Sequence, residues 1–556
     1  MKKLFLIFFS LAYTLAVSQV GPDKYFVRFT DKNNSPYSIS DPLEFLSQRA
    51  IDRRADQGIP IVENDLPVNP QYLQGVEQAG AEILNPSKWL NGVSVFTDDP
   101  TVIQAIEELP YVASTTRISQ LKSDAGRGEE KPFFRNEVYD QPAPLNIIKS
   151  GRGTMYDYGL AFNQINMLNG DQMHEMGYRG QGMVIAVLDA GFIGTDTHPA
   201  FDSIWMNDQV LGTRDFVDGG EVSFTTHPHG TMVLGTMAAN EAGAMIGTAP
   251  MASYWLIRSE DGGSEYIIEE YNWVSAAEFA DSAGADIINS SLGYTTFNDP
   301  SQNHSYDDMD GNTTPITIGA DFAASKGILV VNSLGNEGNS SWYYLAAPSD
   351  GDSVMGVGAV DGQGEYASFS SHGPSADGRV KPNVAAQGSG VYTVDPWNTY
   401  TFSGGTSFSS PIMAGMSACL WQANPEMTNM EILSAIQQSA SQYTNPDDLL
   451  GYGIPDIMMA NNILTVIDGP EEANIQVAAF PNPFDEYIRI ELRTADAGLE
   501  ESRVEVVDLA GKVLISEGFT AGKEKVLDTG TIPSGIYFMK ISGINGESKT
   551  LKIIKR

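Results

Sequence analysis

The chain contains one cysteine, Cys419, in 556 residues. A single cysteine permits no internal disulfide, so the fold must be stabilised by its packed core. Cys419 lies within an apolar stretch, and a cysteine in such a place is typically a small core residue rather than a reactive thiol. We therefore expect Cys419 to be buried and chemically inert.

Basic residues are also scarce, since 33 Lys and Arg stand against 70 Asp and Glu, for a formal net charge of −37. A surface this acidic disfavours nucleic acid and anionic membranes as partners. Long apolar runs are missing as well, because no segment after the first 17 residues is apolar enough to cross a bilayer. The composition therefore indicates a soluble protein whose copies repel one another.

The first 18 residues have the pattern of a secretory signal peptide. Lys2 and Lys3 precede an apolar stretch at residues 4–17, and the sequence Ala-Val-Ser at 16–18 offers a small-residue cleavage site. The alternative, a buried N-terminal helix, does not account for the lysine pair or the cleavage pattern. We expect residues 1–18 to be removed on secretion.

The sequence GGTSFSSP at residues 404–411 places Ser407 at the start of an apolar helical run, residues 412–420. The positive end of the helix dipole would then point at Ser407, which suits a nucleophile whose reaction builds negative charge nearby. A serine alone is a poor nucleophile and requires a base and a group that orients the base.

His229 and Asp189 are the candidates for these two roles. Asp189 follows five apolar residues, 184–188, which predict a buried parallel strand, and catalytic groups gather at the carboxyl ends of such strands. His229 precedes a helical run at residues 233–239. The chain order Asp, His, Ser is that of subtilisin and differs from that of chymotrypsin.

Five sequence blocks in this order resemble the subtilisin-like serine proteases (subtilases). They are DAG at 189–191, HGT at 229–231, IINSSLG at 287–293, LGNEG at 334–338 and GTSFSSP at 405–411. The resemblance extends over about residues 158–464. One departure is Ala190, where the family usually has Ser or Thr after the catalytic aspartate.

The resemblance implies a serine endopeptidase that needs no metal or organic cofactor. Ser407 would be the nucleophile, His229 the general base, and Asp189 the residue that orients His229. Asn336 would donate to the oxyanion. The residues that the resemblance places in the substrate groove are Ser291, Leu292, Gly293 and Gly335.

Alternating strands and helices predict an α/β fold for residues 155–467, a mainly parallel sheet with helices on both faces. The strands are expected at 184–188, 254–257, 287–289, 328–332 and 354–359, and helices at 266–282 and 319–326.

Residues 19–118 have the pattern of a small α+β unit, which resembles the propeptide that acts as folding chaperone and inhibitor in this family. An unrelated N-terminal binding domain is the alternative. Residues 119–154 are polar and charged, so we expect an exposed linker in which maturation cleavage falls.

After a linker at 468–474, residues 475–556 show short alternating strands, which predict a β-sandwich. The motifs FPNPF at 480–484, DLAGK at 508–512 and PSGIYF at 533–538 resemble the C-terminal sorting domain of the type IX secretion system. This implies export across the outer membrane of a Gram-negative bacterium. A fibronectin-like or carbohydrate-binding sandwich is the alternative, but the few aromatic residues argue against sugar binding.

Two segments carry metal-like patterns. DMDGN at 308–312 has alternating oxygen ligands around a glycine, as a calcium loop does, but lacks the distal glutamate of an EF-hand. We favour a solvated acidic turn over a structural calcium site. His227 and His229 lack an evident third ligand for zinc, and the triad explains His229 better.

The sequence therefore predicts a secreted or cell-surface endopeptidase that cleaves polypeptides through an acyl-enzyme. Its partners would be polypeptide substrates, its own propeptide as inhibitor, and the type IX machinery. An inactive subtilase scaffold retained for surface binding is the alternative, although such scaffolds usually lose a triad member. A processing protease specific for one partner also fits the sequence.

Overall fold

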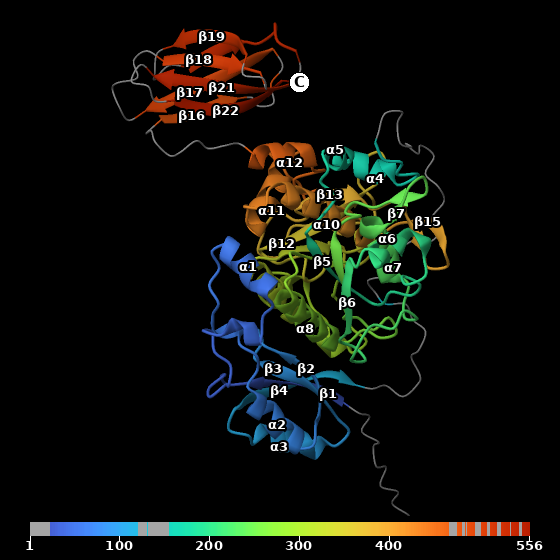
Figure 1. Cartoon of the computed structure of the whole chain (residues 1–556). Coiled ribbons are helices and arrows are strands. Elements are labelled where there is room, and N and C mark those ends of the chain that lie inside the picture. The colour runs from blue at the N-terminus through green and yellow to red at the C-terminus, as the bar shows by residue number, and fades with distance from the viewer. Residues whose placement is uncertain are drawn as a thin grey trace, which may run out of the picture. The chain divides into compact units, whose positions relative to one another are not determined.

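The computed structural model describes two compact units, one within residues 1–461 and one within 462–556 (Figure 1). The described residues of the first are 23–120, 131 and 155–461; those of the second are 462–465, 475–480, 484, 486–494, 502–508, 512–519, 524–533, 535–543 and 548–555. The expected signal peptide at 1–18 lies outside the described residues, as does most of the expected maturation region.

The N-terminal part of the first unit is an antiparallel sheet with the strand order β2-β3-β1-β4. Its strands are β1 (Asp23–Phe29), β2 (Glu82–Ser87), β3 (Gly92–Thr97) and β4 (Val112–Gln120). Helices α2 (Pro70–Gln78) and α3 (Pro100–Glu107) cover one face of the sheet (Figure 1). Helix α3 begins with Pro100 after the cap Asp99, whose carboxylate accepts from the N–H of Thr101. The prediction of a small α+β unit is confirmed.

The rest of the first unit surrounds a sheet of seven parallel strands, which confirms the predicted fold class. In spatial order they are β13 (Val384–Gln387), β12 (Val354–Val360), β11 (Leu329–Ser333), β10 (Ile287–Ser290), β5 (Val184–Asp189), β9 (Ser253–Arg258) and β6 (Val210–Asp215). The strands β5, β10, β11, β12 and β13 are buried along their whole length, as expected for a parallel sheet covered on both faces.

Helices lie on both faces of this sheet (Figure 1). The principal ones are α7 (His229–Ala238), α8 (Ile268–Ala283), α9 (Pro315–Ser325) and α10 (Thr406–Ala423). The remaining helices and short strands of the unit are α1 (Gln48–Asp56), α4 (Phe162–Asn166), α5 (Gly170–Glu175), α6 (Asp202–Met206), α11 (Asn429–Gln438), β7 (Asn240–Glu241), β8 (Met245–Ile246), β14 (Val391–Asp395) and β15 (Thr399–Ser403); α12 (Ile457–Leu464) ends the peptidase region. Cys419 is fully buried in α10, and burial raises the pKa of its thiol, so it is an inert core residue as predicted.

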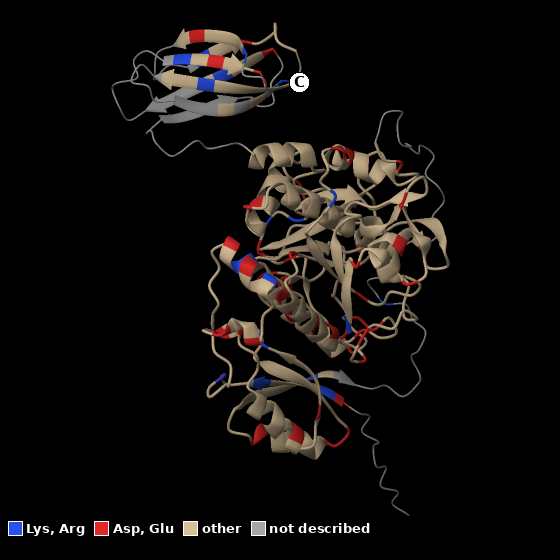
Figure 2. Ribbon diagram, in the orientation of Figure 1, with Lys and Arg blue, Asp and Glu red and all other residues tan. Residues whose placement is uncertain are grey.

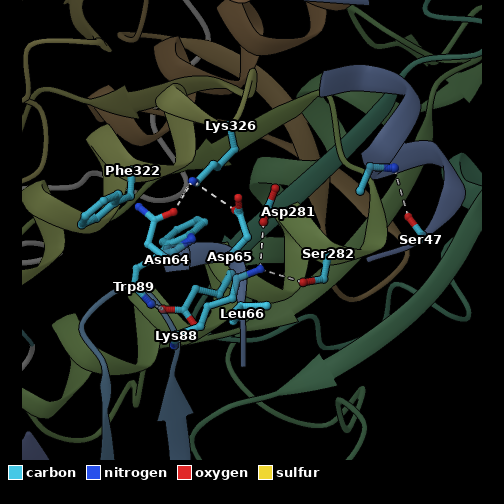
Figure 3. A network of polar contacts seen from close by, with 12 residues as sticks. Ser47, Asn64, Asp65, Leu66, Lys88, Trp89, Asp281, Ser282, Phe322 and Lys326 are labelled. Atoms are coloured by element: carbon cyan, nitrogen blue, oxygen red, sulfur yellow. Dashed lines mark hydrogen bonds and ion pairs between the residues drawn. The ribbon is translucent and has the colours of Figure 1, made fainter. Parts of the chain in front are cut away.

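The N-terminal sheet is joined to the parallel-sheet region through α8. Figure 2 shows acidic positions along α8 and basic positions on α1. Asp281 of α8 is fully buried, with the cations of Arg53, Arg54 and Lys88 within 2.6, 2.9 and 2.9 Å (Figure 3 shows the Lys88 contact). Burial alone would raise the pKa of Asp281, but these three cations hold it well below its usual range.

A second carboxylate of α8 binds backbone rather than cations. Glu278 accepts hydrogen bonds from the hydroxyl of Ser87 at 2.6 Å and from the N–H groups of Lys88 and Trp89 at 2.7 and 2.9 Å. It thereby caps the turn between β2 and β3. A further acid of this region, Asp65, contacts Arg54 and Lys326 at 3.0 Å each (Figure 3 labels Lys326 and Asp65).

The second unit is a pair of antiparallel sheets with its own core. One sheet has the order β16 (Ile475–Phe480), β17 (Tyr487–Thr494), β20 (Glu524–Asp528); the other has β19 (Val513–Phe519), β18 (Ser502–Val507), β21 (Gly535–Gly543), β22 (Ser548–Lys555). Buried residues from both sheets, including Ile490 and Met539, form the core. The predicted β-sandwich is therefore present. Within the described part of the chain, no helix has both the length and the apolar character that a membrane span requires.

Candidate active site

Asp189 is the last residue of β5, in the middle of the parallel sheet between β10 and β9. Its Oδ1 lies 2.7 Å from Nδ1 of His229 and accepts a second hydrogen bond, also 2.7 Å, from the N–H of Ala190. Both side chains are fully buried. A carboxylate in this position can hold one tautomer of the imidazole and stabilise its cationic form.

His229 begins α7, and Gly230 explains how the helix can start so close to β5. A Cβ at position 230 would lie 2.4 Å from the carbonyl oxygen of Gly191 and 2.9 Å from Cβ of Asp189. Any larger residue would therefore push the helix away from the strand end. The Gly after His229 is what allows the short contact between Asp189 and His229.

Ser407 is the second residue of the 18-residue helix α10 and is fully buried. The neighbouring Phe408 ring lies 6.3 Å from the ring of His229, so the start of α10 lies beside the start of α7. The Oγ of Ser407 is 3.4 Å from the carbonyl oxygen of Ser291. The predicted nucleophile, base and orienting acid thus converge at the carboxyl edge of the sheet.

Pro411 gives the first turn of α10 an unusual hydrogen bond. In an α-helix the carbonyl of residue 407 would accept from the N–H of residue 411, but proline has no N–H. Instead the hydroxyl of Ser291 donates to the carbonyl of Ser407 at 2.8 Å. The loop after β10 is thereby bonded to the residue predicted to be the nucleophile.

Asn336 lies in the loop after β11, where Gly335 has a φ of +117°, a conformation that favours glycine. The side-chain oxygen of Asn336 accepts from both the N–H and the hydroxyl of Thr406, at 2.8 and 2.9 Å. The hydroxyl of Thr406 in turn accepts from the N–H of Gly335 at 3.2 Å. These bonds hold the amide of Asn336 next to the N-terminus of α10.

The predicted groove residues lie in two neighbouring loops at this edge. Ser291, Leu292 and Gly293 follow β10, and Gly335 follows β11, its neighbour in the sheet. Asn332, near the end of β11, joins that strand to the loop after β10, because its amide donates to the carbonyl of Leu292 at 3.0 Å.

Sequence reasoning missed a group of three buried carboxylates in this region. Glu260, Glu265 and Glu269 offer oxygens within 4.8 Å of one another, close enough to share one cation. The ammonium of Lys131 lies among them. The density of acidic residues directly after the strand at 253–258 was the available signal.

The residues of the two metal-like sequence patterns form ordinary hydrogen bonds to nearby protein groups. Asp308 accepts from the N–H and hydroxyl of Ser305, and Asp310 from the N–H of Asn312. Nδ1 of His227 accepts from the N–H of His229 at 3.3 Å. Among the described residues, neither pattern belongs to a group of three potential ligands.

Comparison with known proteins divides the chain in three. Residues 180–453 match the subtilase family, residues 24–132 a peptidase S8 propeptide domain of Bacteroidota, and residues 478–556 a secretion system C-terminal sorting domain.

Individual relatives match between half and two thirds of this chain. Subtilisin DY of Bacillus licheniformis is 32% identical over 293 residues, which cover 52% of this chain and 93% of that protein. Subtilisin E of Bacillus subtilis (strain 168) is 30% identical over 300 residues, 53% of this chain and 70% of that protein. A thermostable alkaline protease of Halalkalibacterium halodurans is 28% identical over 357 residues, 64% and 84% of the two chains.

Proposed function

The chain belongs to the subtilase family of serine peptidases, and from this premise we propose that Asp189, His229 and Ser407 are its catalytic triad. The protein is a secreted hydrolase of peptide bonds, with a propeptide and a type IX sorting domain that directs it across the outer membrane. The observation that carries the proposal is the 2.7 Å bond between Asp189 and His229, with Ser407 at the adjoining helix start.

In the first half of the reaction, Oγ of Ser407 attacks the carbonyl carbon of the scissile peptide. His229 takes the proton from Ser407 and passes it to the leaving amine, so that the C–N bond breaks and an acyl-enzyme remains. Asp189 orients His229 and stabilises the imidazolium. In the second half, a water molecule deprotonated by His229 attacks the ester, and Ser407 recovers its proton.

The negative charge on the substrate oxygen is stabilised by the amide of Asn336 and the N–H of Ser407. Thr406 fixes the orientation of Asn336 before substrate arrives, so little reorganisation is needed at the moment of reaction. Loss of one such donor typically costs ~10²–10³ in kcat, a figure that was measured in a subtilisin.

Extended polypeptide would lie along the loops that carry Ser291, Leu292, Gly293 and Gly335 and add as a strand. No metal or organic cofactor takes part in this scheme. At residues 308–312 we propose an acidic turn rather than a structural calcium site, because Asp308 and Asp310 accept hydrogen bonds from neighbouring backbone N–H groups.

The same proposal gives each segment of the chain a role. Residues 19–118 would inhibit the enzyme until cleavage within 119–154 frees the peptidase domain at 155–467. The linker at 468–474 would join it to the sorting domain at 475–556.

Labelling with a fluorophosphonate tests the triad. We expect purified protein without its propeptide to be labelled, and Ser407→Ala and His229→Ala to be unlabelled. Absence of labelling in the folded parent protein, with removal of the propeptide verified by mass spectrometry, would instead indicate an inactive scaffold that serves in binding.

A further inference from the structure

Lys131 is buried among three glutamates of the peptidase domain. Its Nζ contacts Glu260, and lies 2.7 Å from Oε1 of Glu269 and 3.2 Å from Oε2 of Glu265. The four side chains are each at most 3% exposed. Lys131 lies in the proposed maturation region 119–154 and also within the propeptide family match, which ends at residue 132, so the segment before the peptidase domain supplies the cation and the enzyme supplies the acids.

The pocket is built from two loops and one helix end. Glu260 and Glu265 lie in the loop after β9, and Glu269 is the second residue of α8. Glu269 also accepts from the N–H groups of Asp261 and Tyr266, at 2.9 and 3.0 Å, which closes the loop around the pocket. The wall opposite is Tyr294, whose hydroxyl donates to Glu260.

This pocket adjoins the proposed catalytic residues. The N–H of Ser259, which directly precedes Glu260, donates to the carbonyl of Asp189 at 3.1 Å. A Cβ at Gly262 would lie 2.6 Å from the ring of His227, two residues before His229. Tyr294 directly follows Gly293 of the predicted substrate groove. The loops that form the pocket are therefore the loops that border the groove.

A cation in the pocket favours the ionised form of the three glutamates. Burial raises the pKa of Glu265 to about 8 and also raises the pKa values of Glu260 and Glu269, in each case against the opposing effect of Lys131. Without a positive charge, ionised carboxylates at this depth would be uncompensated. Lys131 shows that an ammonium on a four-carbon chain reaches all three.

We propose that Glu260, Glu265 and Glu269 form a substrate subsite selective for lysine, which Lys131 of the propeptide fills in the zymogen. The inference rests on the proposed peptidase function and names its substrate class. A maturation cleavage after Lys131, within the proposed region 119–154, places the selected lysine on the N-terminal side of the scissile bond. An apolar side chain of equal length would leave buried acids unpaired, so it should be accepted poorly.

The test uses the mature enzyme and quenched fluorescent peptides in which lysine or norleucine stands at each of six positions before the scissile bond. We expect lysine to raise kcat/KM at one position by ~10- to 100-fold over norleucine, the range that a charged hydrogen bond produces. At pH 9, where Glu265 is ionised, Glu265→Gln keeps the shape of the side chain and should remove most of that ratio. The exposed acid Glu221 provides a matched control, since Glu221→Gln should keep the ratio. Fluorophosphonate titration gives the concentration of active sites in each variant.

The other outcomes separate the two proposals. Hydrolysis with no lysine preference at any position would overturn the subsite while leaving the peptidase function intact. If Lys131→Met then lowers the unfolding temperature of the Ser407→Ala zymogen, the pocket is an anchor for the propeptide only. A calcium-dependent rise in unfolding temperature that Glu265→Gln removes, again without lysine preference, assigns the pocket to a metal ion. Absence of both hydrolysis and labelling would overturn the peptidase function and the subsite with it.

Discussion

At the scale of single residues, the backbone carbonyl of Ser407, the proposed nucleophile, accepts a hydrogen bond that also contributes to the stability of the fold. Pro411 removes the donor that the helix would normally provide, and Ser291 replaces it from a neighbouring loop. The hydroxyl of Ser291 also accepts from the amide of Asn289 at 3.3 Å. One side chain thus fixes the start of α10 against the loop after β10.

We expect Ser291→Ala to destabilise the protein by ~1–3 kcal/mol, because it leaves the buried carbonyl of residue 407 without its donor. Denaturant unfolding in the Ser407→Ala background measures this without autolysis. Adding Pro411→Ala restores an N–H to the helix and should recover part of the loss. A double variant no more stable than Ser291→Ala would show that the hydrogen bond is not the cause.

The proposed triad could be predicted from the sequence because each member stands next to a short motif with its own physical signature. The bonds that position Asn336 could not. Thr406 is 70 residues from Asn336, and Lys131 is 138 residues from Glu269, so these contacts arise only when the strands are assembled. No local pattern distinguishes Thr406 from any other threonine at a helix start.

At the scale of elements, α8 packs on one face of the parallel sheet and also forms the surface that the propeptide contacts. Asp281 compensates cations from the propeptide, and Glu278 caps its β2–β3 turn (Figure 3 shows the surroundings of Asp281). Once the propeptide is gone, those cations and amides go with it. The same helix face should therefore matter for the zymogen far more than for the mature enzyme.

We expect Asp281→Asn to destabilise the Ser407→Ala zymogen by ~3–5 kcal/mol, because it removes the carboxylate that pairs with the buried Arg53 and Lys88. The mature enzyme should tolerate the same change. Thermal unfolding of both forms measures the difference, and Asp56→Asn, an exposed position on α1, is the matched control. An equal loss in zymogen and mature enzyme would contradict this account.

The sequence located most of the elements that carry the site, and the errors at their ends have local causes. A helix was predicted over 266–282, whereas α8 begins at Ile268, since Glu269 binds the N–H of Tyr266 and keeps that residue in the loop. The next helix was predicted from residue 319 but begins at Pro315, after the cap Thr314. The true start of this helix was signalled in the sequence by a threonine followed by a proline. The hairpin of β14 and β15 was not predicted.

At the scale of the whole molecule, the sorting domain and the peptidase belong to separate compact units. The sandwich has its own core, and the peptidase region ends with α12. We therefore expect the stability of each unit to be independent of the other.

We expect a chain that ends at Thr465 to keep the unfolding temperature and fluorophosphonate labelling of the peptidase, while export from the producing bacterium is lost. Calorimetry and labelling of the purified protein, with fractionation of the cells, measure these three quantities. Loss of labelling in the shortened chain would show that the sandwich contributes to the active site.

The position of β5 has a consequence for how long the enzyme takes to form. It is the first strand of the parallel sheet in the chain, yet its neighbours β9 and β10 are made much later, and such distant pairings are slow to find. Arg49 of the propeptide donates to the carbonyls of Gly182, just before β5, and Gly284, just before β10, and so bridges the two strand starts in the folded protein. A mature enzyme without the propeptide lacks this bridge, so we expect its working life to depend on how slowly it opens rather than on how readily it refolds.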